Sequence, residues 1–102
     1  MSTAFDALAE PSRRHILDLL RDGERAVGEL TDDLALSQPS VSKHLRVLRD
    51  AGLVAVRTDA QRRVYRLRLD PLMEVDQWLA PYRRIWDERL DALEARLDEM
   101  ED

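Results

Sequence analysis

Cysteine is absent from this chain of 102 residues, which also has only three glycines and four prolines. Without cysteine the chain has no disulfide bond, no thiolate metal ligand and no cysteine nucleophile. The scarcity of glycine and proline leaves no low-complexity segment and no Gly/Ser-rich linker. A chain of this length is enough for one compact domain and too short for two, so we expect residues 1–102 to form a single domain.

Long apolar runs are absent as well. No segment approaches the roughly 18 uninterrupted apolar residues that a membrane-spanning helix needs. Residues 1–6 have neither the basic stretch nor the apolar run of a signal peptide. We therefore expect no membrane partner. A chain without cysteine also suits a reducing compartment, so we expect the protein to be cytoplasmic.

Sequence motifs of enzymes are missing too. The chain has no Gly-rich phosphate loop and no Ser/His/Asp arrangement, and its two histidines, His15 and His44, fall on separate predicted helices. We therefore expect no enzymatic activity, no cofactor and no metal site. Acids on the last predicted helix leave weak binding of a hard cation as an alternative, but a solvated acidic face is the simpler interpretation. These acids are Glu74, Asp76, Asp87, Glu88, Asp91 and Glu94.

The formal net charge of −5 is distributed unevenly along the chain. Residues 1–33 carry −4, residues 34–69 carry +6 and residues 70–102 carry −7. The basic residues of the central block are Lys43, Arg46, Arg49, Arg57, Arg62, Arg63, Arg66 and Arg68. Charge blocks also arise by chance on solvated surfaces, but a polyanion responds to the local field rather than to the net charge. The central block therefore indicates a surface suited to nucleic acid.

Capping signals and apolar spacing predict four helices in the first half of the chain. Thr3, Pro11 and Ser37 suit the starts of helices, and Gly23 and Gly52 suit their ends. Apolar residues recur at helical spacing between these signals. The predicted helices cover residues 4–9, 11–22, 27–34 and 38–51.

Alternation with a period of two follows Gly52. Tyr65, Leu67 and Leu69 occupy every second position, as in a half-buried strand. With the apolar run that begins at Leu53, they predict a β-hairpin whose polar tip is residues 57–61. The chain is thus predicted to be mainly α with a small β-hairpin, in the order α-α-α-α-β-β-α.

The last predicted helix, residues 71–101, carries an apolar seam. Leu72, Leu79, Trp86, Leu93 and Met100 recur every seven residues, which is the spacing of a coiled-coil seam. Pro81 must kink this helix or split it in two. The seam predicts a homodimer, although its aromatic residues would also suit a small-molecule pocket between subunits. The predicted interface consists of Phe5, Leu72, Leu79, Tyr82, Trp86, Leu93 and Leu97.

Residues 27–45 are typical of a helix, a tight turn and a second helix. On a helical wheel of about 100° per residue, Val41, Leu45 and Leu48 fall on one side of the second helix. The rest of that helix presents short or hydrogen-bonding side chains near its N-terminus. This polar set consists of Gln38, Pro39, Ser40, Ser42, Lys43 and Arg46.

The polar set suits the major groove of DNA. Gln pairs bidentately with adenine, and Lys or Arg pairs with guanine. Arg62 and Arg63, near the hairpin tip, would reach the flanking minor groove or the backbone. Together these features predict a winged helix-turn-helix that binds double-stranded DNA.

Four segments carry a resemblance to the ArsR family of bacterial repressors. They are residues 8–17 (LAEPSRRHIL), 37–45 (SQPSVSKHL), 48–54 and 63–67, and the likeness covers nearly residues 3–79. The resemblance implies a winged-helix dimer on a two-fold-symmetric, palindromic operator, with the terminal helices in the subunit contact. By position it implies that Gln38, Pro39, Ser42 and Lys43 face DNA and that Arg62 and Arg63 belong to the wing.

The chain departs from the metal-sensing members of that family. Those members use cysteines around the third helix, or Asp, His and Glu sets on the last helix. In this chain the region of the third helix has Ala26 and Val27 in place of cysteines, and the last helix has no histidine. The chain therefore resembles a cysteine-free subgroup whose inducers are often undefined. Regulation by a small-molecule effector is left open. The alternatives are a winged helix that binds protein and a metal-responsive repressor with a non-cysteine site.

Overall fold

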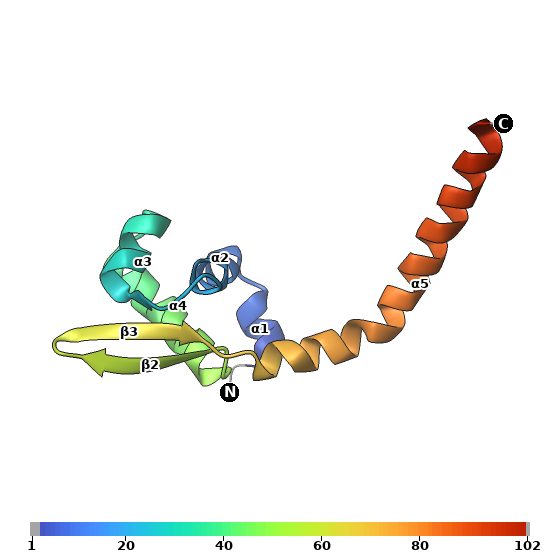
Figure 1. Ribbon diagram of the computed structural model, residues 1–102. Coiled ribbons are helices and arrows are strands. Elements are labelled where there is room, and N and C mark those ends of the chain that lie inside the picture. The colour runs from blue at the N-terminus through green and yellow to red at the C-terminus, as the bar shows by residue number, and fades with distance from the viewer. Residues whose placement is uncertain (1–2, 102) are drawn as a thin grey trace.

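The computed structural model describes residues 3–101, which form five helices and three strands (Figure 1). The helices are α1 (Ala4–Leu8), α2 (Pro11–Leu20), α3 (Val27–Leu34), α4 (Gln38–Asp50) and α5 (Asp70–Glu101). The strands are β1 (Arg25–Ala26), β2 (Val54–Asp59) and β3 (Arg62–Leu67). The predicted class, mainly helical with a small β-hairpin, is confirmed.

The hydrophobic core forms around one face of α4. Val41, Leu45 and Leu48 are completely buried there, together with Ile16 of α2 and Leu30 of α3. These residues of α4 lie three and four positions apart, so they share one face of the helix. Burying that face directs the polar residues of α4 to the surface.

A tight turn sets α3 against α4. α3 ends at Leu34, and the C-cap residue Ala35 adopts the left-handed conformation with φ 54°. The side chain of Ser37 then caps α4, because its Oγ accepts a hydrogen bond from the Ser40 backbone N–H at 3.3 Å. The end of α4 is also constrained, since Gly52 has φ +76°, where a side chain would be strained.

The strands form an antiparallel sheet in the order β1-β3-β2. β1 was not predicted, because a strand of two residues is too short to show alternation. The predicted hairpin tip, residues 57–61, was too long: residues 57–59 pair with residues 62–64, and only Ala60 and Gln61 lie between the strands. Most residues in the pairs nearest the tip are polar and exposed. They belong to the strands but show no apolar alternation, so the sequence pattern alone could not include them.

α5 is a single helix of 32 residues that contains Pro81. Its first half lies beside α1, where the rings of Phe5 and Trp78 meet edge to face with centroids 5.4 Å apart. Figure 1 shows the helix changing direction and its second half extending away from the other elements. No helix among residues 3–101 is long and apolar enough to cross a membrane.

An ion pair links the two outer parts of the sheet. Arg57 of β2 donates from Nη2 and Nε to Glu24, at 2.8 and 3.2 Å, just before β1 begins. These hydrogen bonds hold the pKa of the Glu24 carboxyl below its ordinary value. A group with a lowered pKa stabilises the fold above its unfolded pKa, and this contribution is lost as the pH falls through the folded value.

We predict that Arg57→Gln raises the pKa of Glu24 toward its ordinary value, because the carboxylate loses its main hydrogen-bond donor. The side-chain carboxyl ¹³C shift of Glu24, followed by NMR through an acid titration, measures this change. Arg68→Gln is the control, since Arg68 pairs with Asp70 instead, at 3.5 Å. An identical Glu24 titration in Arg57→Gln and in the unmodified chain would contradict the prediction.

Candidate nucleic-acid interface

One side of α4 and the inner side of the hairpin enclose a polar groove of about 580 Å³. Gln38, Ser42, Arg46 and Arg49 line it from α4, at spacings of four, four and three residues that keep them on one face. Arg63 and Tyr65 line it from β3, and Val27 and Asp50 complete it. Two elements distant in the sequence thus supply three arginines to one groove.

The structure brings together four of the eight residues predicted to bind DNA. Gln38, Ser42, Arg46 and Arg63 line this groove. Arg49 also lines the groove but was not among the predicted residues, although its position one turn after Arg46 was a sufficient signal.

The remaining members of the predicted set lie outside the groove. Pro39, Ser40 and Lys43 are exposed on α4 beside it. Ser40 also belongs to the helix cap, because its hydroxyl is 3.0 Å from Ser37 Oγ. Arg62 is exposed near the hairpin tip and faces α3.

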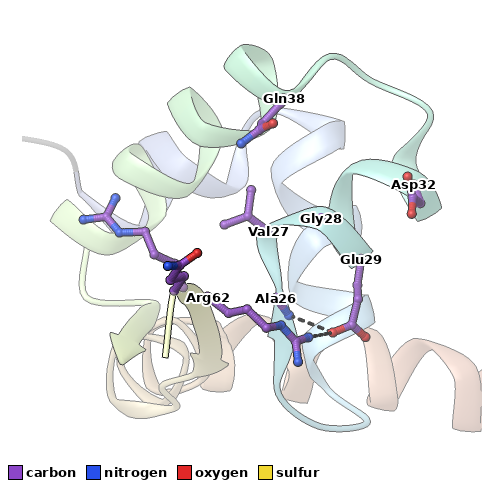
Figure 2. Close-up of a pocket in the computed structure, with 9 residues that line it drawn as sticks. Ala26, Val27, Gly28, Glu29, Asp32, Gln38 and Arg62 are labelled. Carbon is purple, nitrogen blue, oxygen red and sulfur yellow. Dashed lines mark hydrogen bonds and ion pairs between the residues drawn. The ribbon is translucent and has the colours of Figure 1, made fainter. Parts of the chain in front are cut away.

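A second cleft of about 510 Å³ adjoins the first (Figure 2). It lies between the start of α3, the start of α4 and the hairpin tip, and its acids are Glu29 and Asp32. Figure 2 shows Arg62 reaching across to Glu29, and Arg62 Nη2 donates to Glu29 Oε1 at 2.8 Å. Both wing arginines line this cleft, but Arg62 is paired with Glu29 in it, whereas Arg63 also lines the first groove.

The arginines of the groove are available to a ligand. Among residues 3–101, every ion pair of a basic side chain involves Arg25, Arg57, Arg62, Arg68 or Arg83. Arg46, Arg49 and Arg63 are outside this set, so their charges are not neutralised by pairing within the described chain. A concave surface with three such guanidinium groups concentrates positive potential.

The histidines do not form part of this surface. His15 is exposed on α2, and His44 is half-buried on α4 with its Nδ1 lacking a hydrogen-bond partner among the described residues. Within residues 3–101 no three His, Asp or Glu side chains converge in a way that could hold a metal ion.

The groove suits the chemistry of double-stranded DNA. Guanidinium groups bind phosphates and the edge of guanine, and the amide of Gln38 matches the edge of adenine. α4 has 13 residues and an exposed N-terminal turn, and a helix of this kind fits a major groove about 12 Å wide.

Comparison with known proteins agrees with this geometry. Residues 10–56, from the start of α2 into β2, match the bacterial regulatory protein family arsR. The HTH-type transcriptional regulator Rv2034 of Mycobacterium tuberculosis is 52% identical over 64 residues, which are 63% of this chain and 60% of that protein. The transcriptional repressor SdpR of Bacillus subtilis is 33% identical over 79 residues, which are 78% of this chain and 88% of the repressor.

The fold is also that of solved members. The crystal structure of the ArsR family transcriptional regulator RHA00566 superposes with a TM-score of 0.72 at 32% sequence identity, covering 81% of this chain and 86% of that one. The chain therefore belongs to the arsR family of bacterial regulatory proteins, whose members are transcriptional regulators and not enzymes.

Proposed function

We propose that this protein is a repressor that binds a palindromic operator as a homodimer, with α4 in the major groove and the hairpin on the adjoining backbone. The observation that carries the proposal is the groove in which Gln38, Ser42, Arg46 and Arg49 of α4 face Arg63 of β3. SdpR, which is similar over most of its length, is named a transcriptional repressor. A cytoplasmic location follows from this function.

The charge distribution supports one orientation on DNA. The segment of residues 34–69, which includes α4 and the hairpin, carries +6, and the segments on either side carry −4 and −7. Because nucleic acid is attracted by the local potential and repelled by acidic surface, α4 and the hairpin are the favoured side of approach.

The homodimer is supported by the apolar side chains that α5 leaves exposed. Tyr82, Trp86, Leu93 and Leu97 are between 46% and 52% exposed. Large contiguous apolar patches are unusual on soluble monomers and mark interaction sites. Of the predicted interface, Phe5 is exposed beside Trp78, and Leu72 and Leu79 are partly covered within the chain.

Two-fold pairing would also match a palindromic operator. Helix-turn-helix dimers bind two half-sites about one helical turn apart. In a dimer, once one subunit has bound its half-site, binding of the second subunit is effectively intramolecular. The dimer therefore binds the operator more tightly than either subunit binds a half-site. A small-molecule effector would alter DNA binding by changing this two-fold pairing.

The direct test is fluorescence anisotropy with the protein's own upstream promoter DNA and a scrambled duplex of equal length. We expect clear preference for the promoter. If about six phosphates are neutralised, affinity falls by roughly three decades between 50 and 200 mM salt. Equal affinity for the two duplexes at low salt would contradict specific binding and favour a winged helix that binds protein.

We predict that Lys43→Ala combined with Arg46→Ala abolishes the promoter preference. Both side chains are exposed on α4, so the fold and the dimer should be kept. The slope of log affinity against log salt concentration should fall by the amount expected for about two phosphate contacts. The same anisotropy titration measures the loss. Arg21→Ala, at the end of α2 and outside the groove, is the control. A folded double variant with unchanged preference would show that α4 is not the reading helix.

We predict that Trp86→Glu gives monomers, because it places a charge in the apolar seam of α5. Sedimentation velocity measures the change, and weaker promoter binding should accompany it. Ala95→Glu is the matched control, since Ala95 lies on the opposite side of α5 from Trp86, about 180° away on a helical wheel. A Trp86→Glu variant that still sediments as a dimer would rule out this interface.

A further inference from the structure

We propose that Glu29 is a positioning residue that holds the wing against α3 through Arg62, and that Arg63 alone of the two wing arginines contacts DNA phosphate. This inference rests on the proposed function for its DNA part. It differs from the expectation that Arg62 and Arg63 both reach the minor groove or the backbone of DNA.

Strand geometry separates the two arginines. Side chains of adjacent strand residues point to opposite faces, and Arg62 and Arg63 begin β3. Both arginines line the second cleft, but only Arg63 also lines the groove that contains Arg46 and Arg49. Arg62 instead donates to Glu29 at 2.8 Å, across the second cleft (Figure 2).

Glu29 is well placed to hold the wing because its carboxylate already belongs to the start of α3. Its Oε1 accepts a hydrogen bond from the Ala26 backbone N–H at 3.2 Å. Ala26, the N-cap residue, has no side-chain acceptor, so Glu29 makes the cap from inside the helix. Its Oε2 lies 4.0 Å from Arg25 Nη1.

One carboxylate therefore joins three parts of the structure. It contacts β1 through Arg25, the N-terminus of α3 through the Ala26 amide, and the first residue of β3 through Arg62. The β1–β3 ladder ends with Ala26 paired to Val64, so backbone hydrogen bonds with β1 stop short of the tip. The Glu29–Arg62 contact continues that attachment toward Ala60 and Gln61.

Charge favours keeping this pair when DNA binds. If Arg62 moved to a phosphate, it would leave the Glu29 carboxylate without that partner beside a polyanion. With the pair intact, Arg62 neutralises Glu29, and Arg63 remains available on the other face of the strand. The wing then presents one positive charge in a defined position.

The first arm of the test uses the free protein. Backbone ¹⁵N relaxation of Ala60 and Gln61 should show similarly increased mobility in Glu29→Gln and in Arg62→Gln, and no change in Arg63→Gln. Tip mobility that is unaffected by Glu29→Gln and Arg62→Gln would overturn the positioning role. This arm needs no DNA, so it stands even if the proposed function fails.

The second arm measures promoter affinity against salt concentration. Arg63→Gln should lower the salt slope by about 0.9, the value for one phosphate. Arg62→Gln should weaken binding about fivefold, mainly by uncovering Glu29. Adding Glu29→Gln should recover only part of that affinity, because the repelling charge is removed while the wing stays unattached, and the salt slope should equal that of the unmodified protein. A slope lower by about 0.9 in the double variant would show that Arg62 itself contacts phosphate, and an unchanged slope in Arg63→Gln would overturn the role of Arg63.

Discussion

Burial of the apolar face of α4 is the constraint on which the rest of this structure depends. Val41, Leu45 and Leu48 are wholly buried against α2 and α3, and this fixes the rotation of α4 about its own axis. Turning α4 by one residue, about 100°, would expose part of that face and bring Arg46 and Arg49 into the core. Burying a charged side chain without a partner is costly. The groove is therefore a consequence of the core: the side chains that the core cannot accept are the ones presented to a ligand.

The second constraint is the segregation of charge, which lets an acidic protein offer a basic surface. The arginines of the groove come from the central block of the chain, and α5, which belongs to the acidic segment, extends away from the other elements in its second half (Figure 1). Separation of this kind weakens nonproductive approaches of DNA as well as favouring the productive one. The net charge of −5 is thus a poor guide to the partner.

Local signals in the sequence were sufficient for the helices and for the α4 part of the groove. Pro11, Ser37 and Gly52 act at short range, and their effects on the backbone could be read from neighbouring residues. β1 could not be read, because it depends on backbone pairing between segments about 40 residues apart. The full length of the hairpin could not be read either, because most residues of its outer pairs are polar and exposed and show no apolar alternation. The Glu29–Arg62 contact spans 33 positions and leaves no periodic signal, so the different roles of the wing arginines emerge only in three dimensions.

The exposed seam of α5 connects these constraints to symmetry. Its apolar side chains cannot be covered by the chain's own core, since the second half of the helix extends beyond it (Figure 1). A second copy offers a seam of identical composition, and a two-fold axis pairs equivalent surfaces of both chains. The same axis would place two α4 grooves in equivalent positions, as a palindrome requires. Pairing through α5 would then determine the spacing of the grooves, while the contact between Glu29 and Arg62 determines where each wing lies beside its own groove.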